Sequence, residues 1–372
     1  MRSIFVLLFL LTTISAKYLS NKSCSECHEK IYDEFQSSYH SKSYFNDQLH
    51  RKIADKVSKK SYKCALCHMP MANNLDDLIS SKARPDVKNV THSDAISCYF
   101  CHTIAYVKKS HKFFLNVKAK QVEGFKPSFY GPLRDVDHND KHESLKNPIY
   151  TKNVCKGCHA YKLNDYNTTV FRNMKDGDNS QSCIKCHMPK IDGGGEKFNR
   201  KSRMKHSSHR FLGIHDKAFR ATGVDINATF NSGNLNIKLK NKMGHPLIIQ
   251  SARAKFLKIE MFKDGKVIWQ NYKDNPSEDK QGYFSSFYKK DGKKIIIPNL
   301  ATSARFNNID ANSTKVLQYS VPKNADKIEI GFFVQFAKND CFKVLDGLDK
   351  NYTTPQLIKK VELDLKWFKS KI

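Results

Sequence analysis

Apolar and polar residues alternate along the second part of this 372-residue chain, after about residue 218. Glycine, proline, asparagine and aspartate separate the alternating segments. Runs with a period of two residues place apolar side chains on one face of a strand, so they predict an all-β domain, a sandwich. The stretch 356–367 fits a last strand or a helix equally well. The alternating segments are 233–241, 254–263, 266–272, 292–298, 313–321 and 327–336.

The first part of the chain, to about residue 217, has little extended apolar periodicity. One exception is the stretch 24–45, where Ile31, Phe35 and Tyr39 recur every four residues and predict the apolar stripe of a single helix. The remaining sequence is dense in cysteine, histidine, tyrosine and lysine. We expect short helices joined by irregular loops in this region.

A pentapeptide of the form Cys-x-x-Cys-His occurs five times in the first part of the chain. This is the attachment signature of c-type haem, in which two thiols bond the porphyrin and the histidine ligates the iron. A redox dithiol needs no fixed histidine, and a zinc site does not place one after every cysteine pair. The sequence therefore predicts five covalently bound c-type haems. The residues are Cys24, Cys27 and His28; Cys64, Cys67 and His68; Cys98, Cys101 and His102; Cys155, Cys158 and His159; and Cys183, Cys186 and His187.

Five haems over roughly 200 residues leave too little chain to build a conventional core around each one, so the porphyrins themselves must form the core. In the predicted helix, His40 lies twelve residues after His28, or about 18 Å along a continuous helix. It therefore cannot face the iron that His28 ligates. If His40 is a ligand, it serves a neighbouring haem.

The chain has fifteen histidines, so ten remain outside the motifs as candidates for the far side of the irons. His92 and His111 flank the third motif and are held in reserve. His50, His138 and His206 are expected at the surface. Methionine ligation by Met69 or Met188 is disfavoured, because a residue next to the proximal histidine reaches the opposite haem face badly. The five preferred distal ligands are His40, His142, His209, His215 and His245.

The amino terminus predicts export. Residues 1–16 combine an arginine, a short apolar run and a small residue before Lys17, the pattern of a cleaved signal peptide. We therefore expect a soluble periplasmic protein. Cys341 lies outside the motifs and fits a small buried residue. The formal charge of +28 falls to about +18 if ten haem propionates ionise. Such a basic surface suits acidic redox partners or small anions rather than nucleic acid.

Several longer motifs together resemble exported multihaem cytochromes of the doubled-CxxCH superfamily, relatives of the tetrahaem cytochrome that takes electrons from hydroxylamine oxidoreductase. They include Phe35, Ser37 and His40 after the first motif, and CxxCHMP in the second and fifth. The resemblance implies periplasmic electron transfer, with some relatives being enzymes, and an Ig-like second domain. The other matching segments are AISCYFCHTI (95–104), HRFLGIHD (209–216) and KNKMGHPL (240–247).

The expected architecture is thus a signal peptide at 1–16, an α and irregular multihaem cytochrome c domain at 17–218, and an Ig-like β-sandwich at 219–372. Mostly bis-histidine haems would relay electrons from an upstream quinol dehydrogenase or cytochrome to a downstream reductase, without substrate chemistry. The alternative is a reductase or oxidase with one open-site haem acting on a small nitrogen or sulfur compound. No motif variant such as CxxCK marks a catalytic haem, so no catalytic residue is predicted.

Overall fold

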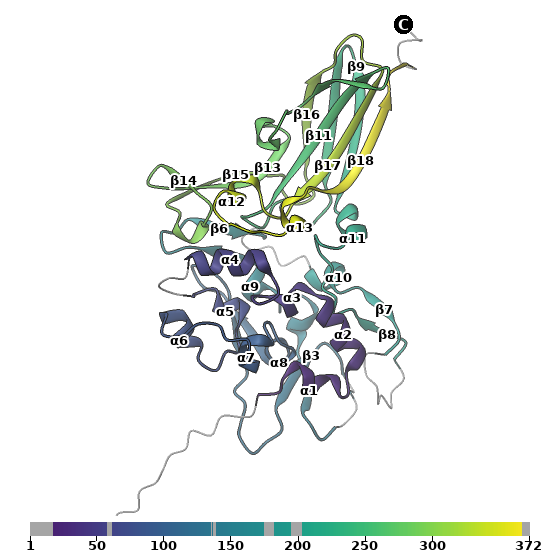
Figure 1. Ribbon diagram of the computed structural model, residues 1–372. Helices are drawn as coiled ribbons and strands as arrows, with labels where there is room; N and C mark the ends of the chain where they lie inside the picture. The colour runs from purple at the N-terminus through teal and green to yellow at the C-terminus, as the bar shows by residue number, and fades with distance from the viewer. Residues whose placement is uncertain are drawn as a thin grey trace, which may run out of the picture.

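The structure, a computed structural model, describes residues 18–57, 62–134, 136, 139–174, 182–194 and 203–366. The predicted signal peptide and His138 lie outside these residues. Figure 1 shows a lower part of short helices and ribbons, in purple to teal, and an elongated β part above it, in green to yellow. Among the described residues, no helix has the length and apolarity that a membrane crossing requires.

The predicted single helix over 24–45 is wrong, because the chain forms three short helices there: α1 (Asn21–Ser25), α2 (Glu29–Ser37) and α3 (Tyr39–Lys42). His28 has φ −110° and ψ 43°, which interrupts the helical path after the first motif. Ser38 is extended, and its hydroxyl accepts a hydrogen bond from Ser41 N, so it caps α3. The two breaks turn His40 away from the axis of α2.

The other helices of the lower part are equally short. Each of the last four haem motifs includes a helix of four to six residues. These helices and their neighbours are α4 (Gln48–Val57), α5 (Ala65–His68), α6 (Leu75–Ser80), α7 (Val90–Ser93), α8 (Cys98–Thr103), the 3-10 helix η1 (Pro148–Thr151), α9 (Lys156–His159) and α10 (Cys183–His187).

Four two-stranded ribbons accompany the helices, and the sequence did not predict them. Strands of three to five residues are too short to display a period of two. The ribbons are antiparallel except for the pair β3 and β4, which is parallel. They consist of β1 (Ile104–Lys108) with β2 (Leu115–Lys118), β3 (Ser128–Gly131) with β4 (Glu143–Lys146), β5 (Tyr161–Leu163) with β6 (Thr169–Arg172), and β7 (Lys190–Asp192) with β8 (Lys205–Ser207).

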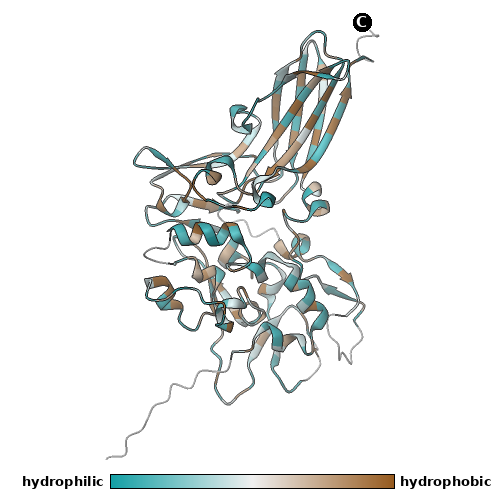
Figure 2. Ribbon diagram, in the orientation of Figure 1, coloured by the Kyte–Doolittle hydropathy of each residue, from teal (hydrophilic) through white to brown (hydrophobic). Residues whose placement is uncertain are grey.

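The upper part contains two antiparallel sheets that share one apolar core. Side chains of β10, including Leu235 and Ile237, meet those of β11 and β17, including Ile259 and Ile330. Figure 2 shows apolar and polar residues alternating along these strands. The smaller sheet has the order β16 (Thr314–Ser320), β10 (Asn234–Asn241), β9 (Val224–Asn231). The larger sheet has the order β14 (Lys293–Ile295), β13 (Tyr283–Lys290), β11 (Ala254–Lys263), β17 (Lys327–Gln335), β18 (Gln356–Asp364), with β12 (Lys266–Gln270) on β11 and β15 (Ser303–Asn307) on β13.

All six predicted strand segments contain strands, and the ambiguous stretch 356–367 contains β18. The structure thus confirms a helical and irregular part followed by a β-rich part, while the Ig-like assignment stays a prediction. Short helices complete the upper part: α11 (Lys217–Thr222), η2 (Pro276–Glu278), η3 (Pro298–Leu300), α12 (Asn339–Phe342) and α13 (Lys350–Thr353).

Hydrogen bonds join the two parts at several places. Asn164, beside the β5–β6 ribbon, donates to the carbonyls of Pro298 and Ala301 at 2.9 and 2.7 Å. Tyr288 donates to the carbonyl of Val170 at 2.7 Å. Figure 1 shows α4 beneath α12 and α13, where lysines of α4 donate to carbonyls of the loop after α12. The β part is therefore fixed on the helical part.

Candidate haem centre

Four motif histidines each face a second histidine ring. A single metal ion between two imidazoles, with metal–nitrogen bonds of about 2 Å, separates the ring centres by about 6.2 Å. The four observed separations fall at this spacing, so the donors present fit an iron in each gap. The pairs are His28 and His142 at 6.3 Å, His40 and His159 at 6.0 Å, His102 and His209 at 6.3 Å, and His187 and His245 at 6.4 Å.

Hydrogen bonds at Nδ1 orient several of these rings. The Nδ1–H groups of His102 and His187 donate to the carbonyls of Tyr130 and Leu212, at 2.8 and 2.5 Å. His209 and His245 do the same to Ser207 and Pro246, both at 2.9 Å. A proton fixed on Nδ1 leaves the Nε2 lone pair free, which is the state that a metal-ligating histidine needs.

Burial keeps these imidazoles neutral. It lowers the pKa of His28, His209 and His245 to about 4 and that of His40 to about 3. The Nδ1 atom of His40 is buried without a hydrogen-bond partner among the described residues. The ring packs edge to face against Phe211, and its centre lies 6.0 Å from that of His159.

The second motif differs from the other four. His68 stacks on His50, with ring centres 3.8 Å apart and planes 17° from parallel. A ligand approaches an imidazole in the ring plane, along the nitrogen lone pair, so a ring stacked face to face cannot lie across the same iron. His68 Nδ1 lies 3.2 Å from the hydroxyl of Ser43, which leaves Nε2 for the metal. Among the described residues, no histidine ring lies opposite His68 at the bis-histidine spacing.

Residues from three segments surround this stacked pair. His50 was expected at the surface, but burial lowers its pKa, and its Nε2 lies 3.2 Å from the hydroxyl of Tyr62. Burial is the main cause of the lowered pKa of His50 and His68, and the contact with Cys158 is the main cause for Cys67. The positive charge of Lys162 lowers all three pKa values further. Lys162 comes from β5, about a hundred residues further along the chain. Sequence spacing gave no signal for this arrangement, because it arises from the fold.

His215, one of the five expected distal ligands, has a different environment. Its ring lies between Tyr39, with centres 3.7 Å apart, and Phe336, at 4.2 Å. Its Nε2 lies 3.3 Å from the guanidinium of Arg253. Burial and the cations around it, Arg253 first, lower the pKa of His215 to about 3. The structure therefore places this ring at the junction of the two parts, facing Arg253 rather than a motif histidine.

The remaining histidines also divide by environment. His92 is buried, and its ring contacts the backbone N–H of Asp86 and the side chains of Asn74 and Asn89, which makes it a structural node. His111 is exposed. His206 was expected to be exposed, but it is 9% exposed and pairs with Glu34.

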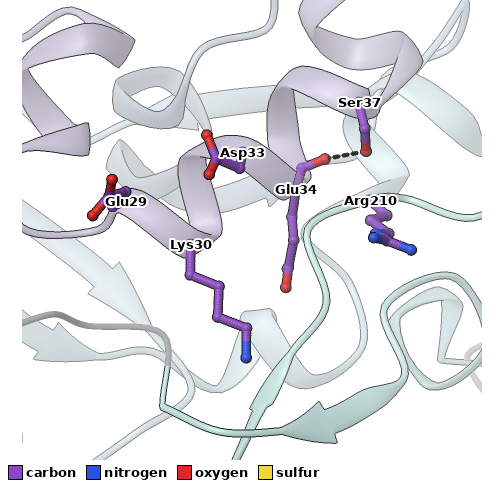
Figure 3. A pocket seen from close by; sticks show the side chains of 6 residues that line it. All are labelled: Glu29, Lys30, Asp33, Glu34, Ser37 and Arg210. Carbon is purple, nitrogen blue, oxygen red and sulfur yellow. Dashed lines mark hydrogen bonds between the residues drawn. The ribbon is translucent and has the colours of Figure 1, made fainter.

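Glu34 is a positioning residue that the sequence did not reveal. Its Oε1 lies 2.9 Å from Nε2 of His206, and its Oε2 accepts a 2.8 Å hydrogen bond from the backbone N–H of His209. Figure 3 shows Glu34 extending from α2 between Lys30 and Arg210, in a surface hollow of about 420 Å³. The carboxylate thus fixes the segment that presents His209. The hollow is lined by Glu29, Lys30, Asp33, Glu34, Ser37 and Arg210.

Cysteines of different motifs lie side by side. In each pair, the neighbouring thiol is the largest influence on the pKa of the other. The contacts link the first motif to the third, the second to the fourth, and the fourth to the fifth. The pairs are Cys24 with Cys98, Cys67 with Cys158, and Cys155 with Cys183.

Comparisons with known proteins show similarity in part of the sequence and in the fold. Residues 23–103 match the family model described as Cytochrome c554 and c-prime. The fold is similar to that of a penta-heme cytochrome c552 from Thermochromatium tepidum, with a TM-score of 0.73 and 22% identity over 93% of this chain and 98% of the other. No curated protein matches the chain. The repeated motifs and the family match support a multihaem c-type cytochrome, and the structural likeness shows a shared fold.

Proposed function

We propose that this chain carries five covalently bound c-type haems and relays electrons between redox partners in the periplasm. The observation that carries the proposal is the spacing of the four facing histidine pairs, 6.0 to 6.4 Å between ring centres. When bound, haem iron with two imidazole ligands changes between its ferric and ferrous states without an open position for a substrate. The proposed pairs are His28–His142, His159–His40, His102–His209 and His187–His245.

The arrangement of the motifs supports a relay. Contacts between cysteines bring the fourth motif beside both the second and the fifth, and the first beside the third. The thiol of Cys101, in the third motif, also contributes to the raised pKa of Cys155 and Cys158 in the fourth, so the two motifs are neighbours. The fourth motif is therefore the branch point of the proposed path. Burial lowers the pKa of both of its histidines, His159 and His40, whose ring centres are 6.0 Å apart.

The β part has a defined role in this proposal. It begins near residue 219 and supplies His245, from the loop after β10, to the fifth motif. A haem domain at 17–218 would therefore lack one axial ligand without it. The net charge of +28 before cofactors favours acidic partners, whose association would slow as salt screens the attraction.

Ligand variants test the proposed pairs. We expect His142→Ala to retain five haems, because its cysteines and His28 remain, and to convert one low-spin haem to high-spin. His111→Ala is the matched control, since His111 is exposed and faces no motif histidine among the described residues. Haem is counted as the pyridine haemochrome and spin state is read by electron paramagnetic resonance. Unchanged spectra in His142→Ala would refute the assignment of His142.

A second function is favoured by the second motif. Because His50 stacks beside His68 instead of facing it, we propose that this iron has an open position that a small nitrogen or sulfur anion can enter. Lys162 supplies a positive charge near that motif, and the hydroxyl of Tyr62 lies 3.2 Å from Nε2 of His50. Nitrite is the test ligand: it should shift the optical spectrum of one high-spin haem. A protein whose haems are all low-spin and indifferent to nitrite would exclude this function.

A further inference from the structure

Lys255 is a buried lysine close to the loop that carries His245. It lies at the second position of β11 and is 7% exposed. Its ammonium donates a 2.8 Å hydrogen bond to the carbonyl of Leu247, two residues after His245. Its charge also lowers the pKa of His245, which places the two groups near each other. Lys255 therefore lies beside the proposed fifth haem position.

Lys255 has a second cation as its neighbour. Burial lowers the pKa of Lys255, and the charge of Arg253, two residues earlier in the chain, lowers it further. The guanidinium of Arg253 lies 3.3 Å from Nε2 of His215. Neither residue forms an ion pair with a carboxylate within the described ranges. Burial lowers the pKa of Arg253, and Asp47 and the hydroxyls of Tyr39 and Tyr352 oppose this by raising it. The charged group that acts on Lys255 is a like charge.

Two neighbouring cations, one buried and one half-buried, are costly. A desolvated ammonium without an anion loses several kcal/mol relative to water, and a like charge beside it adds to the cost. One carbonyl oxygen satisfies one of the three protons on the lysine. An anion beside the two groups stabilises such a pair; Asp47 favours the charge of Arg253, but no carboxylate among the described residues favours that of Lys255.

We propose that Lys255 and Arg253 form a carboxylate-binding site, and that its occupant is a propionate of the haem held between His187 and His245. The inference rests on the haem ligation proposed above. Lys255 would then bind the propionate and the loop carbonyl of Leu247 at once, so that one side chain links the cofactor to the segment carrying its axial ligand. Arg253 would link the same carboxylate to the stacked ring of His215.

The site would also set the reduction potential of that haem. Reduction adds one negative charge, so a nearby cation favours the reduced form and raises the potential. One unit charge within about 10 Å, at an effective dielectric constant of about 20, changes such an equilibrium by roughly tenfold. Loss of the Lys255 charge should therefore lower one midpoint potential by about 59 mV, the value of a tenfold change for one electron.

Spectropotentiometric titration of the holoprotein tests the site with Lys255→Gln, Lys255→Arg and Arg253→Gln. We expect one of the five midpoint potentials to fall by about 59 mV, a tenfold change in the equilibrium constant, in the two glutamine variants. In Lys255→Arg it should stay near the wild-type value. Lys338→Gln is the matched control: Lys338 is 3% exposed and donates to the carbonyl of Ser286, but it acts on no motif histidine among the described residues. Arg253→Gln keeps the test valid if Lys255→Gln does not fold.

The outcomes separate the two proposals. If Lys255→Gln and Arg253→Gln contain five haems, four of them low-spin, and have the same potentials as Lys338→Gln, the carboxylate site is overturned. The proposed function is left standing by that result. If His245→Ala leaves every haem signal unchanged, the proposed ligation is overturned instead. A shift of the wild-type potential by added acetate, absent in Lys255→Gln, would assign the site to a dissolved carboxylate and overturn the propionate.

Discussion

Asn241 determines whether His245 reaches its place, and its replacement gives the sharpest test of the junction. The side chain is fully buried at the end of β10. Its amide donates to the carbonyls of His245, Ile309 and Asp310 at 2.9, 3.1 and 3.0 Å, and its oxygen accepts a 3.0 Å bond from Met243 N. One side chain therefore links the segment that carries the proposed ligand His245 to the segment of Ile309 and Asp310.

The expected cost follows from those bonds. Asn241→Leu keeps the size of the side chain but leaves three buried carbonyls and one N–H without this partner. The amide has two protons for its three carbonyls, so the loss amounts to two donated bonds and one accepted bond; at about 1 kcal/mol for each, the wild-type loop position loses about 3 kcal/mol. A loss of that size changes the equilibrium between attached and detached His245 by about 150-fold. We expect a fraction of one haem to become high-spin at unchanged haem content.

The assay combines guanidinium unfolding with electron paramagnetic resonance of the oxidised protein. Asn271→Leu is the control, because Asn271 donates to Leu257 O and Asp279 and accepts from Ile259 N in the same β part, away from His245. It should destabilise the protein without changing any spin state. Equal spectra for Asn241→Leu and wild type, with only stability lost, would refute the claim that the loop positions a ligand.

Three further predictions concern the other unusual groups. Lys162→Gln should weaken nitrite binding at the second motif by roughly tenfold, as expected for the loss of one nearby charge, with the optical titration as the readout and Lys338→Gln as control. Glu34→Gln should destabilise the protein by about 1–3 kcal/mol, because the buried acceptor of His206 and of His209 N loses its charge, as measured by guanidinium unfolding. His215 has a folded pKa lowered to about 3 against about 6.5 unfolded, so it favours unfolding as pH falls below about 6.5. His215→Phe should therefore lessen the stability lost between pH 7 and pH 5 by about 1–2 kcal/mol, and an unchanged pH dependence would contradict this account.

Local patterns in the sequence predicted the elements that local chemistry determines. Strands β10, β11 and β17 were expected from alternation, and the structure contains them. Strand β13 was missed because its residues are buried on both faces, so its sequence YFSSFYKK does not alternate. The predicted helix over 24–45 failed at His28 and Ser38, where the backbone leaves the helical region although the apolar spacing continues.

Contacts between distant segments determined the rest. His206 is buried because it pairs with Glu34, 172 positions away in the chain, and no spacing rule connects them. His215 shares the segment HRFLGIH with His209, yet Phe336 and Arg253 of the β part surround its ring. The sequence predicted a solvated His50, but in the structure Tyr62 and His68 lie against its ring. Motif spacing identifies donors, while the fold decides which donors meet.

The most direct test of the central claim is the electron paramagnetic resonance spectrum of the oxidised, purified protein, quantified against a pyridine haemochrome count. The account predicts five haems per chain, four of them low-spin from the facing histidine pairs and one high-spin from the second motif. Fewer than five haems, or more than one high-spin haem in the resting protein, would contradict the proposed histidine pairs.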